Sequence, residues 1–179
     1  MIIPKLETPR LILRGWTEKD LDAYADMCSD PDVMRYINQE GKVFSRAESW
    51  RNMAMVMGHW LLRGYGLWAV EKRSHGAMIG RVGLWQPEGW PDLEVGWTLH
   101  KDFWGQGFAT EAAQASLNYA FTVMGETELI SLINPHNLAS QRVAERLGMK
   151  QVRIEKVMGH EVIIYQIYRA DWLLCHYIN

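Results

Sequence analysis

Apolar and polar positions along the chain follow two periods, one typical of strands and one typical of helices. Over residues 93–99 they alternate, which predicts a strand. Over 109–124 the apolar residues recur at helical spacing, which predicts a helix. A loop with Gly105 and Gly107 separates the two elements, and glycine allows the tight turn that this loop needs. We expect the rest of the chain to be organised around this strand, loop and helix.

The remaining pattern predicts further strands and helices, with no internal repeat or linker. Strands are expected over residues 6–14, 67–71, 78–85 and 128–133, with two more around 158–161. Helices are expected over 18–28, from a Ser45 cap to Gly64, and from Asn137 to Gly148. Short turns join neighbouring strands, so we expect an antiparallel meander within a mixed sheet. The chain is therefore interpreted as an α/β protein with one domain over 1–179.

The helix after Ser45 has a marked amphipathic pattern. Ser45 and Glu48 have the spacing of a capping box, in which each side chain bonds the backbone of the other residue. The apolar residues at helical spacing are Trp50, Met53, Met57, Trp60 and Leu61. We expect most of this stripe to face the core.

Composition is typical of a globular protein. The chain has 179 residues, 48% of them hydrophobic, and a mean hydropathy of −0.21. A net charge of −2 without a basic block argues against a nucleic-acid surface. No apolar run approaches the roughly 20 residues of a membrane span, and we expect no signal peptide. Cys28 and Cys175 lack metal-ligand spacing and are too few for a disulfide scaffold, so we expect no metal site and a reducing, cytoplasmic location.

The glycine loop before the central helix predicts an anion site. The first turn of a helix has unpaired N–H groups and a partial positive charge, and glycines leave them open to a ligand. Thr110 stands where a dinucleotide fingerprint needs its third glycine, and no lysine follows the glycines as in a phosphate loop. A different phosphate-bearing ligand is therefore expected.

Residues 104–109 read Trp-Gly-Gln-Gly-Phe-Ala, which resembles the pyrophosphate loop of the GNAT superfamily of acetyl-CoA-dependent N-acetyltransferases. The family pattern is Arg/Gln-x-x-Gly-x-Gly/Ala, so Trp104 departs from it at the first position. The loop is similar to the version found in the branch that contains the ribosomal-protein N-terminal (alanine/serine) acetyltransferases.

A second motif supports the resemblance. Residues 134–149 are similar to the family segment Asn-x-x-Asn-x-x-Ser/Ala followed by Lys/Arg-Leu-Gly-Phe, and the likeness covers about residues 8–170. Taken by itself, Asn137 is also a good helix N-cap. The resemblance implies the GNAT fold, with a mixed, mostly antiparallel sheet, a splayed central strand pair and flanking helices. In the family the central strand bulges, and Gly96 is consistent with a bulge.

The resemblance implies acetyl-CoA as the cofactor and a set of residues that hold it. They are Trp97, Thr98, Leu99, Trp104, Gly105, Gln106, Gly107, Phe108, Ala109, Thr110, Asn134, Asn137 and Ser140. The backbone of 97–99 would hold the pantetheine arm, and the amides of the loop would hold the pyrophosphate. We expect Glu111, in the first turn of the helix, to be structural.

Two residues are candidates for proton transfer. Glu94 is an acid in an otherwise apolar strand that leads into the cofactor loop, and it is the predicted base that deprotonates the attacking amine. Many family members use a tyrosine seven residues after the Asn that matches Asn137, but Ala144 stands there. Ser140, one turn earlier, is the predicted replacement acid; alternatively it only caps the helix or binds the cofactor.

The acceptor is a primary amine whose identity the sequence leaves open. Residues 34–36, the final hairpin, and the side chains of Tyr36, Trp85 and Trp90 are expected to form its pocket. The resemblance favours a protein or peptide N-terminal α-amine. A small amine such as a polyamine, an amino acid or an aminoglycoside is the alternative, and a non-catalytic acyl-CoA-binding domain is another. The high aromatic content makes a homodimer plausible.

Overall fold

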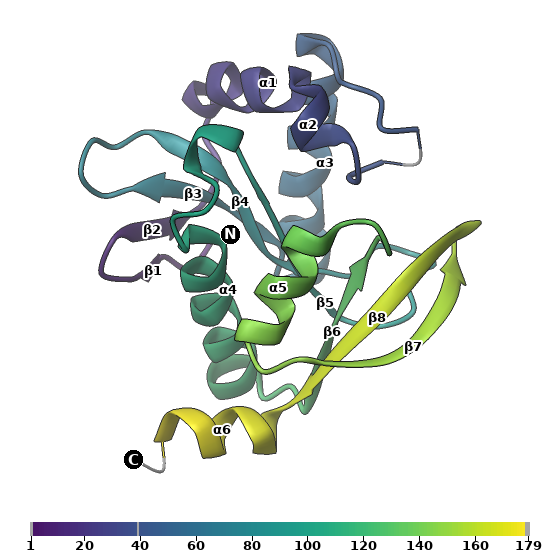
Figure 1. Cartoon of the computed structure of the whole chain (residues 1–179). Helices are drawn as coiled ribbons and strands as arrows, with labels where there is room; N and C mark the ends of the chain where they lie inside the picture. The colour runs from purple at the N-terminus through teal and green to yellow at the C-terminus, as the bar shows by residue number, and fades with distance from the viewer. Residues whose placement is uncertain (1, 39, 178–179) are drawn as a thin grey trace.

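The computed structural model describes residues 2–38 and 40–177, which form one eight-stranded sheet flanked by helices (Figure 1). The strands are β1 (Leu6–Glu7), β2 (Leu11–Arg14), β3 (Leu67–Lys72), β4 (Met78–Trp85), β5 (Glu94–Leu99), β6 (Glu128–Ile133), β7 (Lys150–Val157) and β8 (His160–Tyr168). Their order across the sheet is β1-β2-β3-β4-β5-β6-β8-β7. Neighbours are antiparallel except β5 and β6, which are parallel. The predicted mixed, mostly antiparallel sheet is confirmed.

Helices cover both faces of this sheet. One face carries α1 (Leu21–Ser29), α2 (Pro31–Met34) and most of α3 (Arg46–Arg63), and the other carries α4 (Phe108–Tyr119), α5 (Leu138–Arg146) and α6 (Arg169–Tyr177). Short 3₁₀ turns span Glu18–Asp20 and Lys101–Phe103, and a π turn over Ala120–Met124 continues α4. The apolar side chains form two clusters, one centred on α4 and one between α1, α3 and the sheet.

The central strands β5 and β6 separate soon after they meet. Their ladder consists of the pair Glu94 and Ile130, and Ile130 N donates to the Leu93 carbonyl at 3.0 Å. Beyond this point β5 stays paired with β4, whereas β6 pairs with β8. Ser131 Oγ still reaches across and donates to the Val95 carbonyl at 2.6 Å. The splayed strand pair expected from the sequence is therefore present.

The expectation of a bulge at Gly96 is wrong. β5 pairs with β4 in unbroken register from Glu94 opposite Trp85 to Leu99 opposite Gly80. The split arises because β6 turns away to pair with β8, and no extra residue in β5 is needed. A Cβ added to Gly96 would meet only the Glu94 carboxylate, at 3.9 Å, so glycine here keeps the space above the strand open.

The expected strand over 6–14 is two short strands that form a hairpin. Pro9 lies in the turn, where its missing N–H and fixed φ are tolerated. Thr8 closes the turn: its N donates to the Leu11 carbonyl at 3.0 Å, and its Oγ1 accepts from Leu11 N at 2.9 Å. The expectation of one strand passed over Pro9, which with Thr8 marks the turn between the two.

The Ser45–Glu48 capping box at the start of α3 is confirmed. The predicted core stripe of this helix is partly wrong, because Trp50, Met57 and Leu61 are exposed. The residues that face the core are Ser49, Met53, Val56, His59 and Trp60. At 100° per residue the two groups point about 105° apart around the helix axis, so the predicted five-residue stripe combined residues from two different faces.

Candidate active site

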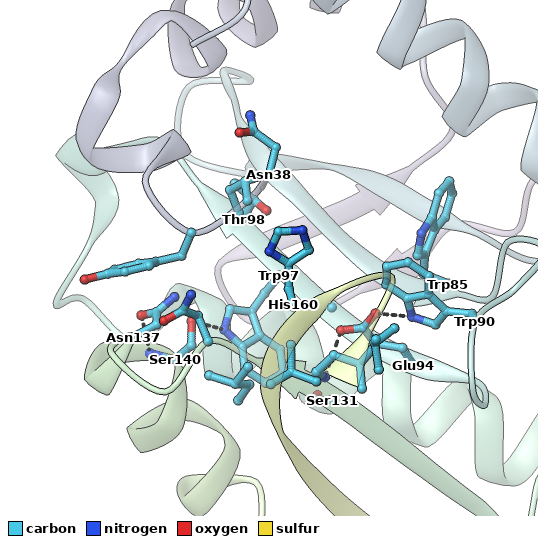
Figure 2. Close-up of a pocket in the computed structure, with 18 of the residues that line it drawn as sticks. Asn38, Trp85, Trp90, Glu94, Trp97, Thr98, Ser131, Asn137, Ser140 and His160 are labelled. Carbon is cyan, nitrogen blue, oxygen red and sulfur yellow. Dashed lines mark hydrogen bonds between the residues drawn. The ribbon is translucent and has the colours of Figure 1, made fainter. Parts of the chain in front are cut away.

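A cavity of about 560 Å³ opens where β5 and β6 separate. Its walls come from the segment between α2 and α3, from β4, β5 and β6, and from the turn of the β7–β8 hairpin. Figure 2 shows Trp85, Trp90 and Glu94 on one side of this cavity and Asn137 and Ser140 on the other. The cavity thus joins the face of the sheet under α1–α3 to the start of α5 through the split.

Glu94 is buried in the wall of the cavity, with 9% of its surface exposed. Its Oε2 accepts a hydrogen bond from Trp90 Nε1 at 2.7 Å, and its Oε1 accepts one from the backbone N of Leu132 at 3.1 Å. Burial raises the pKa of Glu94 to about 7, although both hydrogen bonds and the charge of Arg81 act to lower it. A carboxyl group that titrates near neutral pH can accept a proton and release it again.

The split between the strands explains the position of Glu94. Ile130 N still donates to a backbone carbonyl, that of Leu93 just before β5, but Leu132 N, two residues further along β6, has no such backbone partner. A buried backbone N–H needs an acceptor, and the Glu94 side chain supplies it. The feature that opens the cavity therefore also fixes the carboxylate beside it.

Ser140 lies in the first turn of α5, next to the indole of Trp97. Its Oγ accepts a hydrogen bond from Trp97 Nε1 at 3.3 Å, and its backbone N donates to Asn137 Oδ1 at 3.1 Å. Asn137 is thus the N-cap of α5, as predicted. Ala144, one turn later, is fully buried and has no polar side-chain atom. On this face of α5, Ser140 supplies a hydroxyl where Ala144 cannot.

The start of α4 has the geometry of an anion site. Gly107 is the N-cap with φ +80°, and no side chain caps the helix. Gly105 has φ +71°, and a Cβ added there would meet nothing within 4 Å. Arg10 braces the loop from behind, because its Nη1 donates to the Gln106 carbonyl at 2.9 Å. The first N–H groups of α4 are therefore open to a pyrophosphate.

Trp104, the residue that departs from the family pattern, ties this loop to the end of β5. Its Nε1 donates to the Leu99 carbonyl at 2.8 Å, and 48% of its surface is exposed. The Leu99 carbonyl is therefore engaged within the protein. The Trp104 indole and Arg10 therefore both hold the loop, through the Leu99 and Gln106 carbonyls.

The remaining predicted cofactor residues differ in whether a ligand could contact their side chains or only their backbone. Thr98 lines the cavity. Leu99 and Phe108 have 5% and 3% of their surface exposed and pack into the core, so their side chains cannot meet a ligand and only their backbones could. Ala109 and Thr110 lie in the first turn of α4 and are half-buried. The contribution of this segment is therefore mostly backbone.

All three predicted acceptor residues, Tyr36, Trp85 and Trp90, line the cavity, as does Asn134. Trp85 stacks on the ring of His59 with 4.3 Å between the ring centroids. Trp90 contributes in a second way, since its N–H donates to Glu94. The structure thus brings the expected acceptor residues and the expected base to one site.

Sequence reasoning missed Arg81 and Asn52, which also line the cavity. Arg81 lies on β4, and its Nη1 donates to Asn52 Oδ1 on α3 at 3.2 Å. A signal was present, because Arg81 is a charge inside an otherwise apolar strand, as Glu94 is in β5. Asn52 has no such signal, since polar residues are common on exposed helix faces.

Glu111 is structural in its contacts, as expected. Its carboxylate accepts hydrogen bonds from Thr8 Oγ1 at 2.6 Å, from Arg10 N at 2.9 Å and from Arg10 Nε at 2.6 Å. These bonds join the β1–β2 hairpin to the first turn of α4. They also hold the arginine that braces the glycine loop.

A split central strand pair, an uncapped helix start behind glycines and a buried carboxyl group suit an acyl-CoA-dependent acyltransferase. The chain belongs to the GNAT acetyltransferase family, since residues 10–150 match the family described as "Acetyltransferase (GNAT) domain". Members of this family use acetyl-CoA as their cosubstrate.

Similar proteins agree with this assignment. The chain is 32% identical to the uncharacterized protein YkkB of Bacillus subtilis, with 90% of this chain and 94% of YkkB covered. It is similar to an acetyltransferase structure from Agrobacterium tumefaciens, with a TM-score of 0.84, 28% identity, and coverage of 94% and 96%. The fold is also that of RimL, described as a ribosomal L7/L12 alpha-N-protein acetyltransferase in complex with coenzyme A, with a TM-score of 0.76, 20% identity, and coverage of 94% and 98%.

The residues that the structure describes, 2–38 and 40–177, contain no candidate membrane span and no candidate metal site. No helix within them is both long and apolar enough to cross a bilayer. No group of three or more His, Cys, Asp or Glu side chains among them could hold a metal ion.

Proposed function

We propose that this protein transfers an acetyl group from acetyl-CoA to a primary amine by direct attack, with Glu94 as the general base. One observation carries the proposal: a buried carboxyl group with a pKa of about 7 borders the cavity at the split between β5 and β6. An alkyl amine titrates near pH 10, so it must lose a proton before it can attack a thioester. Glu94 accepts that proton, directly or through one water molecule.

The residues that would hold acetyl-CoA fit its chemistry. The open N–H groups at the start of α4 would bind the pyrophosphate, and each hydrogen bond to a charged group contributes roughly 1.5–3 kcal/mol. Asn134, Asn137 and Trp97 line the cavity and would contact the pantetheine arm. The bound thioester supplies the acetyl group, and backbone N–H groups of β5 near Thr98 orient its carbonyl.

Ser140 is the proposed proton donor to the leaving sulfur. Its Oγ already accepts the N–H of Trp97, so its own hydrogen is available to a further acceptor. Because Ala144 provides no hydroxyl, this role falls to Ser140 on α5. The alternative is that Ser140 only positions the cofactor, in which case its removal weakens binding and leaves kcat unchanged.

The proposed acceptor is the N-terminal α-amine of a protein or peptide. The described activity of RimL, an alpha-N-protein acetyltransferase whose fold this chain shares, supports it. The cavity also suits a chain end, because it is bounded by the α2–α3 segment and the hairpin turn and is lined by aromatic side chains. A small polyamine is the second candidate, which the acidic residues Glu88 and Glu161 in the lining favour.

The test is steady-state kinetics with acetyl-CoA and a panel of N-terminal peptides and polyamines. Glu94→Gln should lower kcat by about 10²–10⁴-fold, the usual contribution of general acid–base catalysis, and leave the affinity for coenzyme A intact. Glu18→Gln, which removes an exposed carboxylate outside the cavity, is the control. Full activity of Glu94→Gln would exclude Glu94 as the base. Absence of acetyl transfer to any amine would contradict the proposed function.

A further inference from the structure

Arg81 places a positive charge in the cavity wall, where it acts on the Glu94 carboxyl group at a distance and lies 5.9 Å from the centroid of the Tyr24 ring. Its Nη1 donates a hydrogen bond to the neutral amide oxygen of Asn52 at 3.2 Å, and the same oxygen accepts one from the hydroxyl of Tyr24 at 2.6 Å. Among residues 2–38 and 40–177, no carboxylate lies within ion-pair distance of Arg81. A guanidinium has five N–H donors, so most of its capacity remains for a ligand.

Arg14 shows what this fold does with an arginine that has a structural role. Arg14 is also half-buried on a strand, and it forms ion pairs with Asp20 at 2.7 Å and with Glu71 at 2.6 Å. A partly buried charge without such partners is costly to maintain. The contrast indicates that Arg81 is kept for an anion that arrives from outside.

Arg81 and Glu94 point to the same face of the sheet. Arg81 is paired with Thr98 and Trp85 with Glu94, and the two pairs are an even number of residues apart along β5. Gly96 lies between them and leaves the space above the strand open. The floor of the cavity therefore has a carboxylate at one end and a guanidinium at the other.

We propose that the acceptor amine carries a carboxylate, which Arg81 binds while Glu94 receives the amine. This inference rests on the proposed function and names its substrate class: a peptide whose second or third residue is acidic. The pair Arg81–Thr98 lies roughly 13 Å along the strands from the pair Trp85–Glu94. The side chains of Arg81 and Glu94 are long, so their charged ends are closer together than that. One or two residues of extended peptide, at roughly 3.3–3.6 Å each, cover that remaining distance, whereas the α-carboxylate of a free amino acid is too close to its amine.

The experiment compares matched peptide amides as acceptors: Ala-Asp-Ala with Ala-Asn-Ala, and Ala-Ala-Asp with Ala-Ala-Asn. For the wild type we expect kcat/KM to be at least tenfold higher for one acidic peptide than for its amide partner. In Arg81→Gln this ratio should fall towards one. Asn52→Asp should have the same effect, because it places a carboxylate 3.2 Å from the guanidinium while keeping its size and the arginine.

Arg46→Gln is the charge control, since Arg46 lies on α3 outside the cavity lining and is exposed and paired with Asp22; it should keep the ratio. Equal acetylation of both peptides by the wild type would overturn this inference and leave the proposed function standing. Retention of the ratio in both Arg81→Gln and Asn52→Asp would also overturn it. Absence of transfer to any amine would overturn both proposals together.

Discussion

Glu94 has an acidity set by opposing contributions from its neighbours. Burial destabilises the charged carboxylate, whereas the hydrogen bonds from Leu132 N and Trp90 Nε1 and the charge of Arg81 stabilise it. Burial is the largest contribution, so the pKa of Glu94 rises from 4.5 to about 7. Both protonation states are then populated near neutral pH, which is the range in which a general base is most useful.

The raised pKa of Glu94 predicts a pH-dependent change in stability. Between pH 4.5 and about 7 the folded state holds a proton that the unfolded chain has lost, so this group stabilises the fold less as pH rises. The neutral side chain of Glu94→Gln does not titrate. We expect the free energy of unfolding of the wild type, relative to Glu94→Gln, to be lower at pH 8 than at pH 5 by about 1–3 kcal/mol.

Urea unfolding at pH 5, 6, 7 and 8 measures this difference. Gln offers one oxygen to two donors, so the variant loses one hydrogen bond at every pH, and only the slope with pH is diagnostic. A difference that stays constant from pH 5 to pH 8 would mean that Glu94 titrates alike in both states.

Trp90 controls the proton affinity of Glu94 through one hydrogen bond. Trp90→Phe keeps an aromatic ring but removes the N–H that stabilises the carboxylate. The pKa of Glu94 should therefore rise further, and the acid limb of the pH profile of kcat/KM should move to higher pH. The control is Trp85→Phe, because Trp85 lines the same cavity but stacks on His59. A limb that moves equally in both variants would argue against this role.

At the scale of elements, the contribution of a helix residue to stability depends on what packs against its face of the helix. Trp50 and Trp60 both belong to α3, but Trp60 has 1% and Trp50 has 51% of its surface exposed. Trp60 also packs edge-on against Trp68, with 4.9 Å between ring centroids, and donates its N–H to the Leu67 carbonyl at 3.0 Å. The same residue type therefore has different roles ten positions apart.

This contrast predicts unequal effects on stability. Trp60→Ala should lower the free energy of unfolding by about 3–5 kcal/mol, because it leaves a cavity in the core. Trp50→Ala should change it by less than about 1 kcal/mol, since the indole loses little contact. Chemical denaturation of the two variants measures both values. Comparable losses would show that the exposed face of α3 is covered in solution.

At the scale of the whole molecule, the proposed function places the two substrates on opposite faces of the sheet. The open start of α4 lies on one face, the proposed acceptor residues lie on the other, and the split between β5 and β6 connects the two faces. Glu94 and Ser140 border this passage from opposite sides (Figure 2). A reaction between two substrates that enter from different faces then needs no large movement of the protein.

Ligand binding at the α4 loop predicts a thermal shift. Acetyl-CoA and free coenzyme A should both raise Tm, and at about a hundredfold excess over Kd they should stabilise the fold by roughly 2.7 kcal/mol. ATP and NAD should have little effect, because the loop lacks the phosphate-loop lysine and the third fingerprint glycine. A comparable rise in Tm with ATP would show that the loop binds phosphate groups in general and does not select coenzyme A.

How far the sequence predicts the protein differs between its parts. The two motifs were enough to indicate the fold, the loop at Gly105 and Gly107, and the candidates Glu94 and Ser140. The C-terminal helix α6 was missed, although its Trp172 is 2% exposed and packs 6.1 Å from the ring of Phe121. A nine-residue helix directly after a strand has no clear local boundary, and its stability comes from packing.

The sequence by itself determined the properties that act locally. Turn glycines, capping residues and the period of apolar positions depend on neighbours within a few residues, so the strand, loop and helix of the cofactor site could be read from them. Only the tertiary structure decided which face of α3 is buried, the pKa of Glu94, and the place of Arg81 opposite Asn52. These depend on burial and on partners distant in sequence, which exist only once the sheet has formed and β5 and β6 have separated.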